Sequence, residues 1–396
     1  MGVKMIRTLL HPGAAAAIAS LFYLEASTVA AAQSSRSADA TGKISNYTDR
    51  RQPIGPGNVI VHPKFGGQML GFGIDAHGNE GLLSEFATLA DGTLVLATET
   101  FAQKTGKILK VVAKDEKNDD YSTWGVFGRH VGLDEFYHQG QNSFPTLNPL
   151  SANAFTGAWT PTIPQGDGLR AITGNLENSD VAVMMIEIGG DELTYVFGSN
   201  LAANTFGPTI TLTDPVFANV PVIALDSKTH QAVVAASYGR TPELALADLK
   251  TGTVTEFQGV GWSYVNGIAV DPATGIAVTT TNGDALTQAG VQFYDLAKQT
   301  GFQVILPCSD DGGEEESGTY VAFDPINSLF LVAQPYNVCN NGSNIYVYDE
   351  KGNVVETLNN FQTLPASPTP IALHPENRSG FVFGNQYGTA LQSFTY

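Results

Sequence analysis

The chain carries little charge, and most of that charge is negative. Asp and Glu number 38 against 20 Lys and Arg in 396 residues, which gives a formal charge of −18. Charged residues make up 15% of the chain, against about 25% in a typical domain. Nucleic-acid backbones and anionic membrane surfaces are bound through Lys and Arg. We therefore expect neither nucleic acid nor a membrane as a partner.

Several motifs of well-known enzyme classes are also missing. The sequence contains no Gly-X-Ser-X-Gly elbow, no P-loop, no His-Glu-X-X-His and no Gly-X-Gly-X-X-Gly that opens a helix. These motifs position a serine nucleophile, a nucleotide phosphate, a catalytic zinc ion and a dinucleotide, respectively. A conventional serine hydrolase, a nucleotidase and a Rossmann dehydrogenase are all disfavoured, and the catalytic residues, if any, stay unknown.

Long apolar runs are lacking except near the N-terminus. The run at 14–24 follows Lys4 and Arg7, is too short to span a bilayer, and precedes the small residues of "TVAAAQ". This order is typical of a secretory signal peptide. We predict a signal peptide at 1–32, a flexible linker at 33–56 and one domain at 57–396. The protein is then secreted, to an extracellular or periplasmic location.

What the sequence does contain is 42 Gly and 20 Pro, placed between short apolar runs. In "VNGIAVDPATGIAVTTTNG" (265–283) an apolar run ends in Asp-Pro, a turn follows, and a second apolar run begins. The pattern recurs with anchor residues 45, 53 and 50 positions apart, namely Asp226, Asp271, Asp324 and His374. A period of about 40–50 residues with several short strands is typical of propeller blades.

The spacing upstream sets the number of blades. A further anchor, Asp75, precedes Asp226 by 151 residues, which leaves room for two more units. We predict an all-β propeller of seven blades, or of six if residues 115–167 are an insertion. The last unit shows only three strands, so we expect an N-terminal strand at 57–63 to supply the fourth and close the ring. Closure removes exposed sheet edges.

Two cysteines and three Asn-X-Ser/Thr triplets matter in an exported chain. Cys308 enters the loop before one innermost strand, and Cys339 lies in the loop after the second strand of the same unit. Both loops open at one end of the blade, so we predict a disulfide between them. On a eukaryotic secretory route the triplets are glycosylation sites, at Asn46, Asn341 and Asn377.

The repeats "NGIAVDPATGIAVT" and "GTYVAFDPINSLFLVA" resemble those of six- and seven-bladed propellers of the gluconolactonase–regucalcin family and of YVTN/NHL repeat proteins. The resemblance implies a divalent metal in the central channel, held by Glu, Asn, Asn and Asp at the starts of innermost strands. Asn266 matches one Asn position. Glu85 matches the Glu position only in a register that competes with Asp75. Thr319 stands where the family has Asp.

Other candidate binding residues gather in loops that open on the same face as Asn266. Aromatic residues beside polar groups suit sugars or flat rings, and they equally fill the top of a propeller. The candidates, besides Asn266, are Trp262, Tyr264, Asn282 and Tyr336. The acidic run at 308–317 offers oxygen ligands for calcium or is a solvated loop. The cluster at 130–138, with two His, Asp134 and Glu135, lacks the tight pairing of zinc sites.

Three functions remain open at this point. The first is an exported protein that binds a small molecule, a glycan or an extracellular protein at its loop face. The second is a metal-dependent lactonase or related hydrolase, in which the ion polarises the carbonyl and activates water. The third is a cyclase or isomerase that uses the channel as a shaped cavity. Only the hydrolase requires a stoichiometric divalent cation.

Overall fold

The fold is taken from a computed structural model of the chain. Between residues 112 and 200 most strand residues are described by their backbone alone. The described residues are 54–74, 79–117, 126–130, 135–143, 146–153, 159–161, 169–175, 180–186, 194–200, 205–218, 221–237, 241–261, 264–281, 289–307, 320–337, 342–361, 371–383 and 389–396. Within them, no helix has the length and apolar character needed to cross a membrane.

The described strands pair antiparallel into seven sheets, which we number in chain order. Sheet 1 consists of β2 (Gln68–Ile74), β3 (Glu80–Thr88), β4 (Leu94–Ala102) and β5 (Ile108–Lys117). Sheet 2 consists of β6 (Val126–His130), β7 (Glu135–Ser143), β8 (Thr146–Asn153) and β9 (Trp159–Pro161). Sheet 3 consists of β10 (Leu169–Asn175), β11 (Asp180–Ile186), β12 (Thr194–Asn200), β13 (Thr205–Phe206) and β14 (Ile210–Leu212). A 3-10 helix, η1 (Pro215–Ala218), follows.

Sheets 4 to 7 repeat the same four-strand order. Sheet 4 consists of β15 (Val222–Asp226), β16 (Gln231–Ala236), β17 (Glu243–Asp248) and β18 (Val254–Gln258), and sheet 5 of β19 (Val265–Asp271), β20 (Ile276–Thr281), β21 (Gly290–Asp295) and β22 (Thr300–Ile305). Sheet 6 consists of β23 (Tyr320–Asp324), β24 (Leu329–Asn337), β25 (Gly342–Tyr348) and β26 (Val354–Phe361). Sheet 7 consists of β27 (Ile371–His374), β28 (Ser379–Phe383), β29 (Leu391–Thr395) and β1 (Gly55–Val61). A short 3-10 helix, η3 (Pro375–Asn377), joins β27 to β28.

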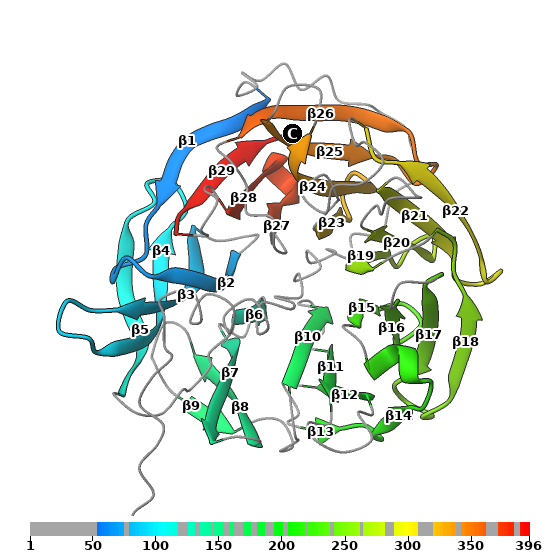
Figure 1. The fold of residues 1–396 in the computed structure, drawn as a ribbon, viewed down its shortest axis with the longest axis horizontal. Helices are drawn as coiled ribbons and strands as arrows, with labels where there is room; N and C mark the ends of the chain where they lie inside the picture. The colour runs from blue at the N-terminus through cyan, green and yellow to red at the C-terminus, as the bar shows by residue number, and fades with distance from the viewer. Residues whose placement is uncertain are drawn as a thin grey trace, which may run out of the picture.

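The first strands of the sheets form a closed circle. Each lies against the first strand of the next sheet, in the order β2, β6, β10, β15, β19, β23 and β27, and β27 lies against β2 again. The sheets radiate outward from this circle, as Figure 1 shows. The predicted all-β propeller is therefore confirmed, with the innermost strand of each sheet at the central axis.

The ring closes through β1, the N-terminal strand. It pairs antiparallel with β29 and becomes the outer strand of sheet 7. The backbone N–H of Val59 also donates to the Ser393 hydroxyl at 3.1 Å. A Cβ added to Gly57 would lie 2.3 Å from that same hydroxyl oxygen, so the close approach needs glycine. Closure by an N-terminal strand was predicted and is confirmed.

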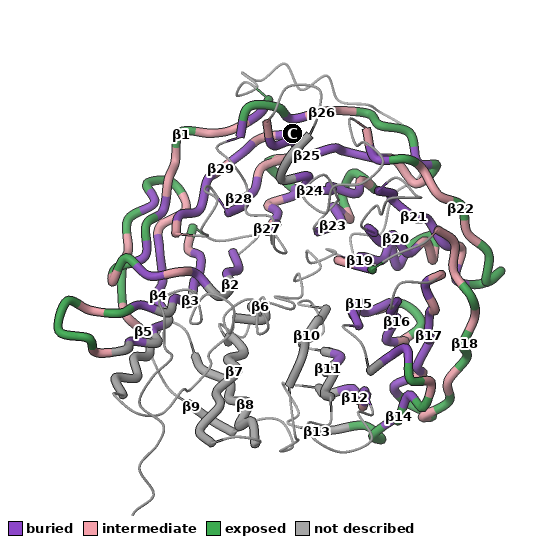
Figure 2. Tube along the Cα trace, viewed as in Figure 1, coloured by how far each residue is buried: buried purple, intermediate pink, exposed green. Residues whose placement is uncertain are grey.

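The core is divided among the interfaces between neighbouring sheets. Ile268 and Val270 of β19 pack toward sheet 4, while the intervening Ala269 packs toward sheet 6. Strand residues alternate between the two faces of a sheet, so each inner strand serves two interfaces at once. Burial falls toward the rim, where the outer strands β18 and β22 contain only half-buried and exposed residues (Figure 2).

The repeated Asp residues close the turns after the innermost strands. The Asp271 carboxylate accepts a hydrogen bond from the N–H of Ala273 at 2.8 Å. Pro272 stands between them, at a turn position where its missing N–H is not required. Gly275 then adopts a left-handed φ of 73°. Asp226 and Asp324 accept equivalent hydrogen bonds, which explains why the sequence repeats this residue.

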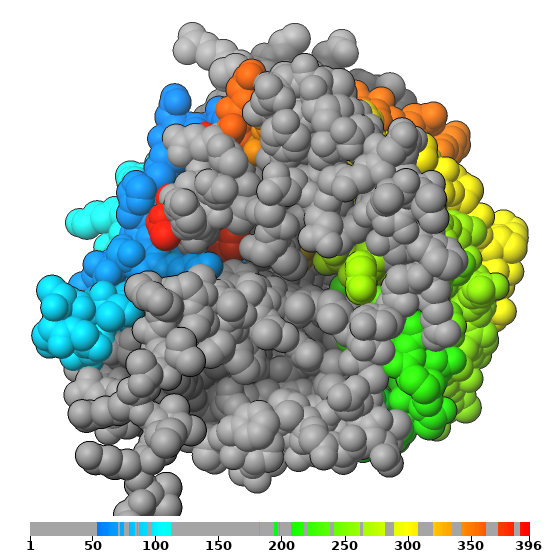
Figure 3. All heavy atoms as spheres, in the orientation of Figure 1, coloured from blue at the N-terminus to red at the C-terminus, as the bar shows by residue number. Residues whose placement is uncertain are grey.

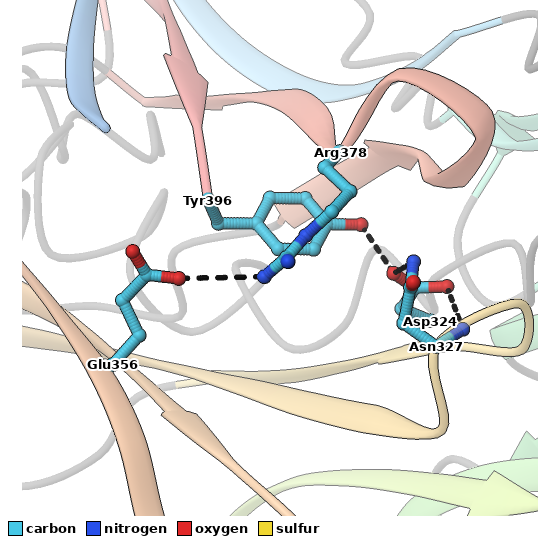
Figure 4. Close-up of polar contacts among 5 residues, drawn as sticks. All are labelled: Asp324, Asn327, Glu356, Arg378 and Tyr396. Carbon is cyan, nitrogen blue, oxygen red and sulfur yellow. Dashed lines mark hydrogen bonds and ion pairs between the residues drawn. The ribbon is translucent and has the colours of Figure 1, made fainter. Parts of the chain in front are cut away.

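A polar cluster joins sheets 6 and 7 at these turns (Figure 4). The Tyr396 hydroxyl donates to Asp324 Oδ2 at 2.8 Å, and Asn327 Nδ2 donates to the same atom at 2.7 Å. Arg378 lies over the Tyr396 ring and forms an ion pair with Glu356 at 3.4 Å. Burial raises the pKa of Tyr396 far above its usual range, so the phenol keeps its proton and acts as a donor.

Candidate functional site

The antiparallel order of the strands separates the two ends of every sheet. The Asp turns lie at one end, which we call the turn end. The chain crosses from the outer strand of one sheet to the innermost strand of the next at the other end, which we call the crossover end. The loop between the second and third strands opens at the crossover end too. Of the predicted binding residues, Tyr264, Asn266 and Tyr336 belong to this end.

Asn266 lies at the start of β19, at the crossover end and beside the axis. The pairing of β19 with β20 shifts between Val265 and Gly267, so Asn266 is the extra residue of a β-bulge. Bulges turn a side chain away from the direction that the pleat would give it. Asn266 is half-buried, and it has a polar or electrostatic partner in the structure. Because β19 is the innermost strand of sheet 5, the backbone of Asn266 lies near the axis, and its role in binding stays a prediction.

The bulge recurs at the same place in two other sheets. In β2 the register shifts between Met69 and Gly71, and in β10 between Leu169 and Ala171. The extra residues are Leu70, Arg170 and Asn266, which lie four, five and five positions before the ends of their strands. The fold therefore places three chemically different residues at equivalent points around the axis, and the sequence pattern does not reveal this.

Tyr264 immediately precedes β19, with 38% of its surface exposed. Its neighbour Val265 is buried, and a Cβ on Gly267 would lie 3.1 Å from the Tyr320 Cα of β23. The backbone that carries Tyr264 is therefore held between two sheets. Trp262 and Asn282 lie outside the described residues, and Tyr336 belongs to β24, but its side chain is not described.

Glu85 lies in β3, the second strand of sheet 1, and not at the start of an innermost strand. The register that gave Glu85 the metal-binding position is therefore wrong, because β2 is innermost and ends just before Asp75. A shift of one strand changes which residues reach the axis. The two carboxylate oxygens of Glu85 accept hydrogen bonds from the backbone N–H groups of Phe65 and Gly67, both at 2.8 Å.

A second buried carboxyl group, Glu99 of β4, lies beside Glu85. The backbone N–H of Lys64 donates to Glu99 Oε2 at 2.9 Å, and both glutamates have no exposed surface. The pKa of Glu99 is raised to about 7, mainly by burial and also by the adjacent Glu85 carboxylate, while the hydrogen bond from Lys64 lowers it. Burial also raises the pKa of Glu85. The two groups fasten the crossover at 62–67 to sheet 1.

Sheet 6 uses the equivalent positions with neutral side chains. When the strand pairings of sheet 6 are aligned with those of sheet 1, Gln334 of β24 takes the position of Glu85 in β3, and Tyr346 of β25 takes the position of Glu99 in β4. Gln334 Nε2 and the Tyr346 hydroxyl both donate to the Pro307 carbonyl, each at 3.2 Å. These residues hold the crossover that enters sheet 6. Glu85 and Gln334 each follow their Asp anchor by 10 positions, a usable signal for this position that the repeat pattern alone did not bring out, whereas Glu99 and Tyr346 differ in their offsets.

Most of the remaining predicted sites lie outside the described residues. These are Cys308 and Cys339, the whole acidic run at 308–317, Asp134, Asn46 and Asn341. Asn377 is described, is exposed in η3 and lies 3.5 Å from His374 Nε2 through its amide nitrogen. In the described part of the chain, no three His, Cys, Asp or Glu residues form a group that could hold a metal ion.

Comparisons with known proteins identify the fold only. No family model matches the sequence, and no curated protein matches it. A chain in the crystal structure of the mitotic checkpoint complex is similar, with a TM-score of 0.56 and 11% identity over 92% of this chain and 99% of that one. The Dos1 propeller has a TM-score of 0.56 and 9% identity, over 86% of this chain and 95% of that one.

Raptor from Chaetomium thermophilum is similar over only part of its length. Its TM-score is 0.56 and its identity 10%, over 86% of this chain and 29% of that chain. Proteins so distant in sequence share a fold without necessarily sharing a function. Together with the closed circle of inner strands, the matches define the protein as a β-propeller. The gluconolactonase or NHL type stays a prediction.

Proposed function

We propose that the protein is an exported β-propeller that binds another protein at its crossover end. The observation that carries the proposal is the bulge at Asn266 beside the exposed ring of Tyr264. A buried neighbour and a close contact with β23 hold both residues in place. A side chain carried on a fixed backbone loses less conformational entropy when a partner covers it, and Tyr is enriched among residues that dominate interfaces.

The structural neighbours support a protein partner over a small molecule or glycan. The matched chains include one from a mitotic checkpoint complex, which is a protein assembly by its name. The proposal also includes export and a disulfide between Cys308 and Cys339. It includes glycosylation at Asn46, Asn341 and Asn377, and calcium binding at the acidic run. The N-terminal sequence of the mature protein tests export, with Gln33 expected as its first residue.

The test compares two crossover-end variants with one turn-end control. Tyr264→Ala and Asn266→Ala are compared with Ile326→Ala, because Ile326 is 54% exposed and lies in the turn after β23. The full-length proteins serve as baits in the medium of the producing cells, and captured proteins are quantified by mass spectrometry. We expect the captured amount of one partner protein to fall about tenfold with either crossover-end variant, a typical cost for a central interface residue. The same protein should be captured by Ile326→Ala as by the wild type.

A metal-dependent hydrolase is the alternative that Asn266 also favours. Metal analysis of the purified protein separates the two. One equivalent of a divalent ion, together with lactone hydrolysis that Asn266→Ala abolishes, would replace the binding proposal. Equal capture by all three variants would contradict the binding site at the crossover end.

A further inference from the structure

The outer strands of the sheets differ in how well their free edges are protected. An edge strand leaves alternate N–H and C=O groups unpaired, and proteins protect such edges with charges, Pro, bulges or very short strands. β5 has three Lys and two register shifts. β1 has Pro56 and a register shift. β9, β13 and β14 have three residues or fewer.

β22, the outer strand of sheet 5, has none of these protections. Its sequence, Thr-Gly-Phe-Gln-Val-Ile, contains no charged residue and no Pro. It pairs with β21 over six residues without a register shift, and in the described strands it has no second strand partner. The neighbouring outer strands differ, because β18 carries Glu256 and β26 carries Glu356 with two register shifts.

Segments next to sheets 4 and 6 contact both faces of β22, so that among the described residues only the edge has no strand beside it. On one face, a Cβ at Gly352 would lie 2.7 Å from Val304 and 2.9 Å from Phe302. On the other face, a Cβ at Gly261 would lie 2.6 Å from Gln303 Oε1. Phe302 and Ile305 nevertheless keep 45% and 46% of their surface exposed. The outer strands of this region form one side of the molecule in Figure 3.

An aromatic stack leads directly to this edge. The rings of Phe293 in β21 and Phe302 in β22 are parallel within 5°, with their centroids 5.1 Å apart. Cross-strand pairs of aromatic or β-branched residues stabilise neighbouring strands. A strand added beside β22 would continue this row with a residue opposite Phe302.

We propose that the free edge of β22 binds an extended segment of another protein as an additional β-strand. The segment has aromatic or β-branched residues at alternate positions and Lys or Arg at its ends. Main-chain hydrogen bonds provide the affinity in this mode of recognition, and alternate side chains provide the specificity. The basic ends follow from the formal charge of −18, which attracts a basic segment and repels a second copy of the chain. This site is separate from the crossover end, so either proposal can fail alone.

The test uses a fluorescent, acetylated peptide of sequence KTVTFTVK and the full-length protein. Fluorescence anisotropy measures binding to the wild type, to Ile305→Lys and to Val355→Lys. Val355 is the matched control, because it is 53% exposed in the outer strand β26 and undergoes the same change of charge. A second probe, the same peptide N-methylated at every backbone amide, keeps the side chains and loses the N–H donors. Thermal unfolding confirms that each variant is folded.

We expect saturable binding of the peptide by the wild type with a Kd below about 1 mM. Ile305→Lys and the N-methylated peptide should each weaken binding about tenfold, whereas Val355→Lys should bind like the wild type. The proposal is overturned if the wild type does not bind the peptide, if N-methylation has no effect, or if Val355→Lys weakens binding equally. A dimer that Ile305→Lys dissociates in sedimentation equilibrium would assign the edge to a second copy and also overturn it.

Discussion

Sheets 1 and 6 fasten their incoming crossovers at equivalent positions with opposite chemistry. In sheet 1, Glu85 and Glu99 accept hydrogen bonds from backbone N–H groups of the crossover. In sheet 6, Gln334 and Tyr346 donate to a backbone carbonyl instead. The comparison shows that the two sheets use the same positions to hold their crossovers. Whether the side chain is an acceptor or a donor depends on whether a backbone N–H or a backbone C=O faces it. Only the acidic version depends on pH.

Glu85→Ala should have the largest effect on this comparison. It leaves the N–H groups of Phe65 and Gly67 without their acceptor, and each unpaired buried group costs about 1–3 kcal/mol. We expect the free energy of unfolding to fall by about 2–3 kcal/mol in urea titrations. The control is Glu256→Ala, an exposed glutamate in β18, which should change stability by less than about 0.5 kcal/mol. Equal effects would show that Glu85 does not anchor the crossover.

The pH dependence of stability should come second. Burial raises the pKa of Glu99 from 4.5 to about 7, so the folded chain binds more protons than the unfolded chain between these values. Its contribution is fully present below about pH 4.5 and is lost as the pH rises through about 7. We expect the wild type to lose about 1–3 kcal/mol between pH 5 and pH 8, measured by urea unfolding at each pH.

Glu99→Gln tests the origin of this dependence. The amide is neutral at every pH and can still donate to Glu85, so the variant should lose less stability than the wild type between pH 5 and pH 8. Asp248 and Asp295 do not interfere, because hydrogen bonds lower their pKa values and they titrate below this range. An unchanged pH dependence in Glu99→Gln would contradict the assignment to Glu99.

Tyr346→Phe should have the smallest effect. It removes one donor to the Pro307 carbonyl and the acceptor of Asn344 Nδ2, but Gln334 still holds that carbonyl. We expect a loss of about 1 kcal/mol in urea unfolding. Because sheet 6 has no acid at these two positions, the loss should be the same at pH 5 and pH 8. A loss that changes with pH would remove the contrast between the two sheets.

The parts of the fold that the sequence predicted depend on local repetition. Asp226, Asp271 and Asp324 each end an innermost strand, and each bonds to the turn that follows it. The hydrogen bonds of each turn join residues only a few positions apart, so the turn can be predicted from the sequence. Closure by β1 was also predictable, because the last unit lacked a fourth strand. The pairing of Cys308 with Cys339 stays a prediction.

The candidate site was predictable only where local register was unambiguous. Asn266 lies where its repeat places it, and the bulge there became visible only through the pairing of β19 with β20. Glu85 was assigned to the wrong strand, because "GLLSEFAT" can be aligned as an inner or a second strand, and such a shift changes which residues reach the axis. Its true partner, Glu99, belongs to another strand.

The sequence by itself determined the all-β repeat, the positions of its turns and the N-terminal strand that closes the ring, because each depends on periodicity and on turn residues a few positions apart. The tertiary structure decided which polar residues meet. Lys64 contacts Glu99 and Tyr396 contacts Asp324 across 35 and 72 residues. Tertiary structure also decided that, among the described strands, β22 pairs only with β21, because an edge is defined by the strands beside it.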